Sequence, residues 1–487
     1  MLRVLGQTGI GFGVGIFLAR TLEVKDFGLM AIAMSLIGLA ELISSLGVEA
    51  SLIQRQQLTR KHLEVGFSLS LIMATVLLLM FWLAGPAMAS FFDQPALALM
   101  LPVLGVGQWF ATIAMVPRAA LRRRFDFKLL SKIELGAYLV GYASFSVVLA
   151  LLDFGVWSLV IATCLWFFLA SMLMFRATNL ALRPAWGMQE IRELLSFGLL
   201  MTSKSAINYT GVTSTNFVVG KLISAHDLGF FTRAEHVAML PLLKIASAFS
   251  SVMFPIYASV QNDRERLTRA YLRTSAAVCL LTAPPLVVTA IFSEVIIVGL
   301  YGEKWMPAAE ILSVLCISSI LICLFHLAGA LVEATNQVWA EIKRQFIYVL
   351  LKISCLYFAA HYGLIEVSFA VVIGSLFLFC SMGQLSLRII GQGWIPYLQA
   401  LAPGLGISAI MAGIALMGSP WLNQLDQSSA LTKLAILAVT SGLIYALLVH
   451  FTPDRWVFGA KSTIQEKILS ALTTKNLPPE KPEKNTS

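Results

Sequence analysis

The stretch RTLEVKDFG at residues 20–28 returns, with substitutions, as KLISAHDLG at residues 221–229. At this constant offset of 201 residues the copies share a leading basic residue, an acidic residue and a glycine: Arg20 and Lys221, Asp26 and Asp227, Gly28 and Gly229. Each copy links two apolar segments, and the second copy comes six segments after the first. An even spacing gives both copies the same orientation in a membrane, which predicts two parallel six-helix lobes and favours an alternating-access transporter.

The composition places most of the chain in lipid. Of its 487 residues, 58% are hydrophobic and only 13% are charged, about half the charge of an ordinary globular chain. Apolar runs of about 20 residues, long enough to cross a bilayer as helices, recur along the sequence. They predict an all-α polytopic membrane protein with about fourteen transmembrane helices, at residues 4–19, 27–47, 65–85, 97–116, 133–152, 155–175, 194–219, 229–257, 272–292, 308–332, 347–360, 365–389, 397–417 and 430–450.

The repeat divides these segments into domains. We expect an N-terminal lobe at residues 1–193, a C-terminal lobe at 194–390 and two helices outside the repeat at 391–452. The polar, proline-rich remainder at 453–487 is expected to form a disordered cytoplasmic tail.

Positive charge is distributed unevenly between the predicted connections. If the N-terminus is cytoplasmic, 26 of the 35 Lys and Arg residues fall in cytoplasmic segments and five fall in outer loops. This bias predicts that both termini are cytoplasmic. Topology thus explains the net charge of +9, and nucleic-acid binding is not indicated.

The sequence shows no pattern typical of a metal site or an enzyme. The six cysteines lie in apolar runs, without CxxC pairs or neighbouring histidines. Phosphate-binding GxxxxGK loops, HExxH helices and nucleophile elbows are missing from the sequence, and the predicted connections are short. We therefore expect no metal, no cofactor and no enzymatic activity, and transport coupled to a proton or sodium gradient.

Four cations interrupt the apolar segments: Lys204, Arg233, Lys244 and Lys352. A charge at the bilayer centre costs several kcal/mol, so such residues normally face a cavity or a partner. Arg233 and Lys244 share one face of their predicted helix, because eleven residues turn it by roughly 1,100°, about 20° beyond three turns. Asn208 lies one turn after Lys204.

These cations predict a substrate-binding cavity formed by Lys204, Asn208, Arg233 and Lys244. Phosphate oxygens accept charge-assisted hydrogen bonds from Lys and Arg, so the cavity suits an anionic head group. Pairing within the protein is the alternative, and the available carboxylates are Glu41, Glu235 and Glu333.

A basic stretch, PRAALRRRFDFK at residues 117–128, follows the fourth predicted helix. It contains Arg118, Arg122, Arg123 and Arg124, which we assign to a cytoplasmic basic patch. One interpretation is a topology signal that touches anionic lipid heads. The other is a first docking site for a substrate that carries pyrophosphate.

Several motifs, taken in order, resemble one protein family: FLARTLEVKDFGLMAIA, LGVEASLIQR, PRAALRRRFDF, LGFFTRAEHVAMLPL and LYGEKWMPAAEILSVL. They are similar to the polysaccharide-exporting branch, comprising Wzx-like and colanic-acid-type lipopolysaccharide biosynthesis flippases, of the multidrug/oligosaccharidyl-lipid/polysaccharide (MOP) flippase superfamily. The resemblance runs from the first predicted helix to about the tenth.

The resemblance implies fourteen helices in two lobes around a central cavity, located in the bacterial cell inner membrane. It also implies translocation of undecaprenyl-pyrophosphate-linked oligosaccharide repeat units for export of exopolysaccharide, capsule or O-antigen. The expected partners are this lipid-linked substrate, membrane lipids, and the polymerase and export proteins of the same pathway.

Other functions remain open at this point. A peptidoglycan lipid-precursor flippase differs only in matching these motifs less well. A multidrug or cation antiporter would need intramembrane carboxylates to bind cations. Only Glu41 lies well inside a predicted N-terminal-lobe helix. A membrane polymerase or ligase is disfavoured by the short loops, and a scaffold would leave the repeat unexplained.

Overall fold

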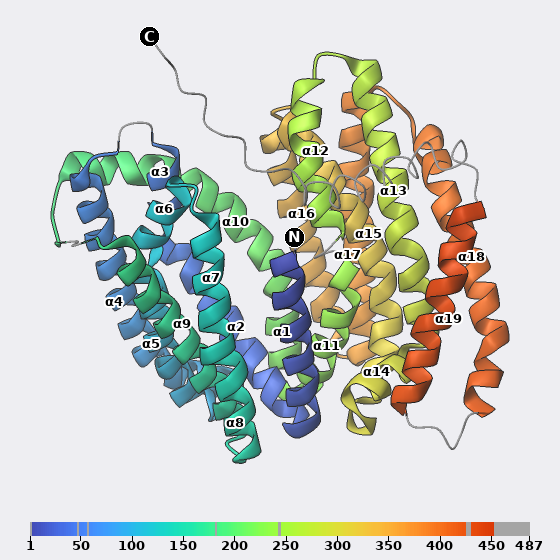
Figure 1. The fold of residues 1–487 in the computed structure, drawn as a ribbon, viewed down its shortest axis with the longest axis horizontal. Coiled ribbons are helices and arrows are strands. Elements are labelled where there is room, and N and C mark those ends of the chain that lie inside the picture. The colour runs from blue at the N-terminus through green and yellow to red at the C-terminus, as the bar shows by residue number, and fades with distance from the viewer. Residues whose placement is uncertain are drawn as a thin grey trace, which may run out of the picture. The chain divides into compact units, whose positions relative to one another are not determined.

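The computed structural model describes residues 2–45, 48–55, 58–180, 183–241, 245–424 and 430–451, and within these ranges every regular element is a helix (Figure 1). Nine helices among the described residues are long and apolar enough to cross a membrane. These observations agree with an all-α polytopic membrane protein, while the total of fourteen spans stays a prediction.

The predicted apolar segments coincide with single helices or with runs of consecutive helices. The first six correspond to α1 (Leu2–Thr21), α2 (Val24–Ser45), α4 (Arg60–Phe91), α5 (Leu97–Ile113), the run α7 (Phe127–Ala137), η1 (Tyr138–Ser144) and α8 (Phe145–Leu151), and α9 (Val156–Thr178). The others correspond to α10 (Met188–Leu222), α11 (Ala225–Ala238) with α12 (Ser247–Ser259), α13 (Arg264–Ile291), α15 (Ala308–Ala334), α16 (Val338–Ala359), α17 (Leu364–Ile390), α18 (Trp394–Gln424) and α19 (Ala430–Phe451).

Four short helices lie between these long ones: α3 (Val48–Gln54), α6 (Met115–Arg123), α14 (Ser293–Tyr301) and the 3₁₀-helix η3 (Glu303–Trp305). They fall largely in stretches that the hydropathy pattern treats as connections. A short helix buries too little apolar surface to leave a clear periodic signal, so its tertiary contacts decide that it forms.

The described residues form two compact units. One comprises the described residues of 2–237, 294–315 and 342–374, and the other comprises those of 238–293, 316–341 and 375–451. The predicted tail at 453–487 lies outside the described residues. The boundaries of these units follow packing, because α10 lies against α2, α3 and α4 within the first unit. The lobes at 1–193 and 194–390, with residues 391–452 and 453–487 outside them, stay a prediction.

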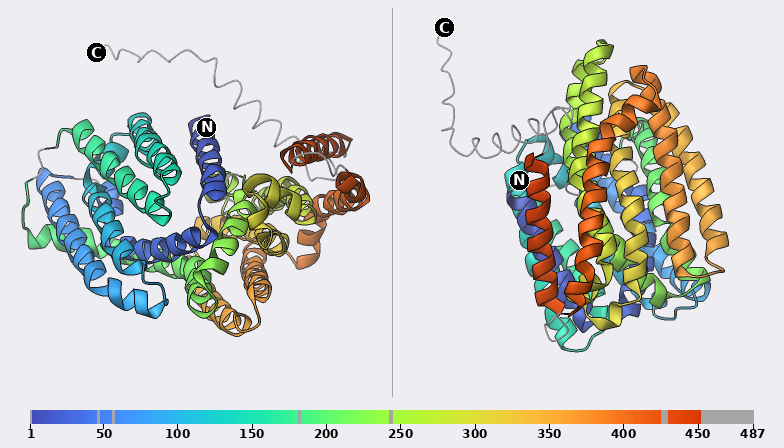
Figure 2. Two further views of the ribbon diagram at one scale, coloured as in Figure 1. Left: turned by 90° about the horizontal axis from the view of Figure 1, so that it is seen from below. Right: turned by 90° about the vertical axis from the view of Figure 1, so that its right-hand side faces the viewer.

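A hydrophobic core joins α3, α4, α6 and the start of α10 in the first unit. Its members are the buried side chains of Val48, Leu52, Val65, Val116, Ala119, Ile191 and Leu194. In the second unit α13 packs along α18, and α19 lies beside α18 (Figure 2).

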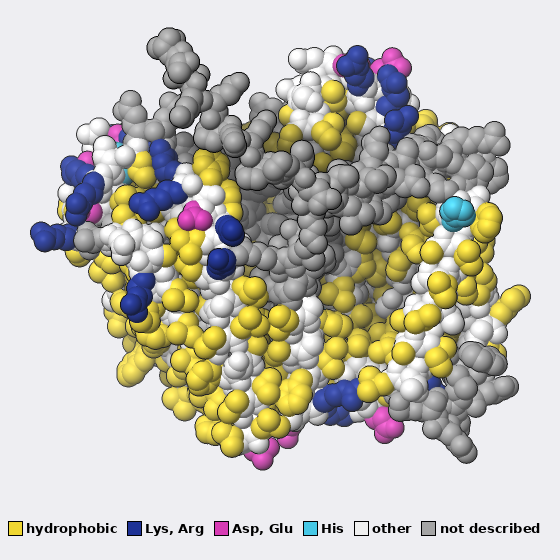
Figure 3. Space-filling view, viewed as in Figure 1, with side chains coloured by type: hydrophobic (Ala, Val, Ile, Leu, Met, Phe, Trp, Pro, Cys, Tyr) yellow, Lys and Arg dark blue, Asp and Glu magenta, His cyan; other side chains and the backbone are white. Residues whose placement is uncertain are grey.

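The surface is apolar where lipid is expected. Large hydrophobic side chains are exposed on the long helices, including Leu83 at 80% and Met417 at 86%. On the face shown in Figure 3, hydrophobic side chains dominate, and Lys and Arg gather near helix ends. Apolar side chains along the helices with Lys and Arg near their ends are typical of helices that span a bilayer.

Candidate functional site

The two copies of the sequence repeat touch each other. Helices α2 and α11 begin at Val24 and Ala225, residues that the offset of 201 makes equivalent. A Cβ added to Gly28 would lie 1.6 Å from the Ala225 carbonyl oxygen, and one added to Gly229 would lie 2.1 Å from the Val24 carbonyl oxygen. The contact is therefore reciprocal, and only glycine fits on either side.

The repeated aspartates fix where these helices begin. The Asp26 carboxylate accepts a hydrogen bond of 3.1 Å from the Glu23 backbone N–H. In the second copy the Ser224 hydroxyl donates to the Asp227 carboxylate at 2.6 Å and accepts from the Asp227 N–H at 3.0 Å. Each aspartate is the third helical residue, as in a capping box, so its role here is structural.

The end of α1 is held by the last turn of α14 and by η3. Arg20 donates from Nε to the Leu300 carbonyl at 2.9 Å and from Nη2 to the Gly299 carbonyl at 2.6 Å. Lys304 Nζ donates to the carbonyl oxygens of Arg20 at 3.0 Å and Leu22 at 2.6 Å. The two chain segments thus exchange hydrogen bonds in both directions.

Two further contacts complete this region. Trp305 is fully buried, and its Nε1 donates to the Ala19 carbonyl at 2.8 Å. Lys221, which the repeat aligns with Arg20, pairs with Asp93 at 2.9 Å. We call the contacts among residues 19–28, 221–229 and 299–305, together with Asp93, the repeat junction.

Arg233, a predicted substrate-binding residue on α11, lies next to the repeat junction. Its guanidinium stacks 4.3 Å from the centroid of the Phe27 ring, and that ring meets Trp305 edge-on at 5.5 Å. The Arg233 Nε is buried and has no hydrogen-bond partner in the part of the chain that the structure describes. Its Nη1 faces α1, 3.8 Å from where a Cβ on Gly15 would lie. Arg233 therefore has a free donor in a low-dielectric setting, where an unpaired polar group is costly.

Of the other three predicted substrate-binding residues, the structure describes the side chain of Asn208 alone. Asn208 is exposed on α10. The side chain of Lys204 and the whole of Lys244 lie outside the described residues. Their contribution to a cavity stays a prediction.

Lys352, the fourth intramembrane cation, is buried, with 4% of its surface exposed. Its Nζ donates to the Gly211 carbonyl at 2.8 Å, and it interacts electrostatically with Glu235. The described residues contain no ion pair between Glu235 and Arg233, although the two are close in sequence. The alternative of internal partnering thus describes Lys352 better than Arg233.

The predicted basic patch is largely engaged with α3. Glu49 pairs with Arg122 at 2.9 Å and with Arg118 at 3.8 Å. Arg123 donates to the carbonyls at the end of α3, of Leu52 and Ile53 at 3.2 Å each and of Arg55. Arg124 is exposed. Three of the four arginines hold a short helix in place, and binding of lipid heads or substrate by the patch stays a prediction.

Ion pairs tie the first turns of α10 to α3 and α4. Glu193 pairs with Arg55 at 2.6 Å and with His62 at 3.1 Å, and Glu190 pairs with Lys61 at 2.7 Å. Hydrogen bonds from Lys61 and His62 hold the pKa of the Glu190 and Glu193 carboxyls, respectively, below their usual value. We call these five residues the ion-pair junction.

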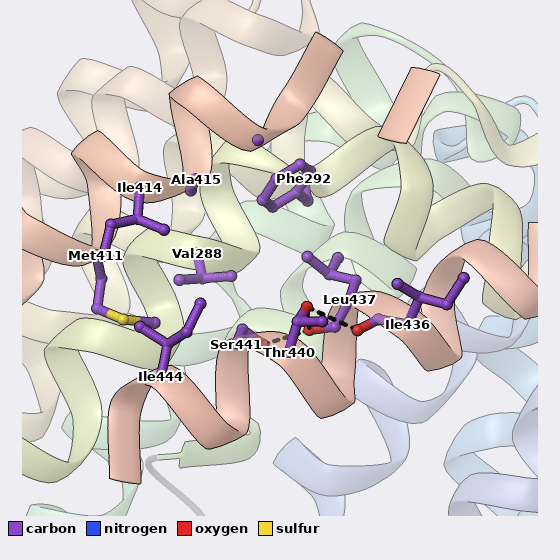
Figure 4. Close-up of a pocket in the computed structure, with 11 residues that line it drawn as sticks. Val288, Phe292, Met411, Ile414, Ala415, Ile436, Leu437, Thr440, Ser441 and Ile444 are labelled. Atoms are coloured by element: carbon purple, nitrogen blue, oxygen red, sulfur yellow. Dashed lines mark hydrogen bonds between the residues drawn. The ribbon is translucent and has the colours of Figure 1, made fainter. Parts of the chain in front are cut away.

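A separate apolar pocket lies in the second unit, between α13, α18 and α19 (Figure 4). Its volume is about 200 Å³, and its lining includes Phe292, Met411, Ile414 and Ile444. The hydroxyls of Thr440 and Ser441 donate to carbonyls of their own helix. The pocket is therefore suited to hydrocarbon.

Comparison with known proteins identifies the class. Residues 17–310, more than half of the chain, match the family described as "Polysaccharide biosynthesis protein", and the chain belongs to that family. It is 24% identical to the teichuronic acid biosynthesis protein TuaB of Bacillus subtilis, over 84% of this chain and 85% of that protein. It is also 24% identical to the lipopolysaccharide biosynthesis protein WzxC of Escherichia coli, over 69% and 68% of the two chains.

Solved structures show the fold. The inward closed conformation of the lipid II flippase MurJ superposes with a TM-score of 0.73, at 13% identity, over 92% of this chain and 97% of that one. An inward-facing multidrug resistance MATE transporter of the MOP superfamily superposes with a TM-score of 0.62, at 17% identity, over 79% and 95%. The predicted resemblance to the polysaccharide-exporting branch of the MOP superfamily is confirmed by these matches and the family assignment.

Proposed function

We propose that this protein is a flippase that moves undecaprenyl-pyrophosphate-linked oligosaccharide repeat units across the bacterial inner membrane for export of surface polysaccharide. The family assignment supports a role in polysaccharide biosynthesis, and relatives are named for teichuronic acid, lipopolysaccharide and succinoglycan transport or biosynthesis. The fold is shared with a lipid flippase.

The observation that carries the proposal is the unpartnered Nε of Arg233 beside Phe27. A pyrophosphate oxygen would satisfy this donor with a charge-assisted hydrogen bond. Lys204, Asn208 and Lys244 complete the proposed binding set.

In the proposed topology both termini are cytoplasmic. The ion-pair junction then lies on the cytoplasmic side and the repeat junction on the outer side. Alternating access requires that these junctions open in turn. Phe27 touches both Trp305 and Arg233, so opening of the repeat junction also changes the environment of the proposed phosphate ligand.

Gene deletion followed by analysis of lipid-linked intermediates and surface polysaccharide tests the function. We expect undecaprenyl-linked repeat units to accumulate on the inner leaflet while surface polymer is lost. Accumulation of peptidoglycan precursor instead would favour the lipid II type of flippase. Unchanged polymer with new sensitivity to cationic drugs would favour an antiporter and refute the proposal.

A further inference from the structure

Three aromatic side chains form a cluster on η1 and α9. The rings of Tyr138 and Tyr142 stack with their centroids 5.3 Å apart and their planes at 20°. Trp166 meets Tyr138 edge-on at 5.6 Å and Tyr142 at 6.3 Å. All three side chains are partly exposed.

The backbone is adapted to this cluster. Tyr138–Ser144 is a π-helix inside an otherwise α-helical run, a rare geometry that occurs frequently at functional sites. A Cβ on Gly141 would lie 2.8 Å from the Cα of Trp166. The glycine thus lets the π-helix approach α9 closely, and this brings the tyrosines to the indole.

A second aromatic cluster differs from this one in being fully buried, as expected for a purely structural role. Tyr271 and Tyr397 stack at 5.8 Å in the other unit, and both are at most 1% exposed. Tyr209 and Tyr445, which are also partly exposed, donate to backbone carbonyls. Unlike the hydroxyls of Tyr209 and Tyr445, those of Tyr138 and Tyr142 have no hydrogen-bond partner within the described ranges.

Lipid hydrocarbon offers no hydrogen-bond partner to these hydroxyls. Tyr138 and Tyr142 lie near the middle of the candidate membrane span Phe127–Leu151, whereas aromatic belts lie at the ends of spans. Helix α1 lies against both the cluster and Arg233, because a Cβ on Gly11 would lie 3.0 Å from the Tyr138 hydroxyl oxygen and one on Gly15 would lie 3.8 Å from Arg233 Nη1. His236, one turn along α11 from Arg233, stacks on Phe12 of α1 at 6.2 Å.

We propose that Tyr138, Tyr142 and Trp166 form a glycan-binding subsite, which holds a sugar ring of the substrate while Arg233 holds its phosphate. A pyranose has an apolar face of C–H groups and a rim of hydroxyls. Aromatic rings pack on the apolar C–H face of the sugar. Free phenolic hydroxyls form hydrogen bonds with the sugar hydroxyls, both as donors and as acceptors. Apolar walls with a few placed polar groups are typical of small-ligand sites. This inference rests on the proposed function and adds the sugar as the part that this cluster recognises.

Binding to purified, full-length protein tests the subsite with two probes. One is undecaprenyl pyrophosphate without sugar, and the other is the same carrier bearing the repeat unit that accumulates in the deletion strain. The double variant Tyr138→Phe, Tyr142→Phe keeps both rings and removes both hydroxyls. We expect it to bind the sugar-bearing lipid roughly tenfold more weakly, as for two lost hydrogen bonds, and the sugar-free lipid unchanged.

Two further variants separate the possible outcomes. Phe145→Leu changes an exposed aromatic residue (43%) on the neighbouring α8 and should leave both affinities unchanged. Arg233→Ala should weaken both lipids together. Equal affinities of the double variant and wild type for the sugar-bearing lipid overturn the subsite but leave the flippase intact. If wild-type protein binds neither lipid, the proposed function itself fails.

Discussion

The repeat junction and the ion-pair junction lie at opposite ends of α10, a helix of 35 residues or about 50 Å. The repeat junction is built from glycines and backbone carbonyls, and even its charged side chains Arg20 and Lys304 donate to carbonyl oxygens. The ion-pair junction consists of opposite charges on side chains that are partly exposed, such as Arg55 and Glu193 at 28% and 30%.

The two junctions would therefore close the proposed transport pathway in different ways. Backbone contacts depend on shape, so a single added methyl group prevents them. Partly exposed ion pairs are individually weak and depend on salt and protonation. We infer that the repeat junction closes as a unit, and that the ion-pair junction opens in small steps.

The largest effect is expected from a methyl group at the repeat glycines. Gly28→Ala places a Cβ where the Ala225 carbonyl lies, 1.6 Å away, and Gly229→Ala does the same toward Val24. Each variant should lose most polysaccharide export at normal membrane levels, because overpacking of a tight contact costs about 1–3 kcal/mol. Gly13→Ala is the matched control on α1, since no atom lies within 4 Å of its added Cβ. Wild-type export from Gly28→Ala would refute the shape-dependent closure.

Arg20→Ala should have the next largest effect. It removes two hydrogen bonds to the carbonyls of Leu300 and Gly299. Because Arg20 is exposed, each bond contributes about 0.5–1 kcal/mol, the lower part of the usual range. The repeat junction should open more often, which raises the labelling rate of a cysteine placed at Leu22, a buried side chain of this junction, by an impermeant maleimide added from outside. An unchanged rate would show that Arg20 does not hold this end closed.

A smaller and pH-dependent effect is expected at the other junction. Because the folded-state pKa of Glu193 is lowered, its stabilising contribution is complete above the ordinary glutamate value of 4.5 and is lost as pH falls below it. Glu193→Gln should lower the melting temperature of purified protein slightly at pH 8. The difference from wild type should vanish in acid. A difference that grows in acid would contradict the assignment.

Lys221→Ala should have the smallest effect. Its partner Asp93 is 77% exposed, and exposed pairs contribute little to stability. We expect export and melting temperature within error of wild type. A loss as large as that of Arg20→Ala would show that the two equivalent basic residues share one role.

The long helices and the repeat were predictable because hydropathy and a constant offset are properties of the sequence itself. The contacts of the repeat junction were not, since Trp305 and Ala19 are 286 residues apart and no local pattern links them. The same holds for Phe27 beneath Arg233. The sequence predicts that Arg123 belongs to a basic patch, but not that it donates to the carbonyls at the end of α3. Helix α3 has only seven residues and leaves little periodic hydrophobic signal in the sequence.

The most direct test is flipping by purified protein in proteoliposomes that contain the sugar-bearing undecaprenyl pyrophosphate. Its sugar is oxidised or labelled from outside to measure the fraction in each leaflet. We predict that wild-type protein makes the inner-leaflet pool accessible, and that Arg233→Ala leaves it protected. Equal protection with wild-type protein and with empty liposomes, under an imposed proton or sodium gradient, would contradict the account.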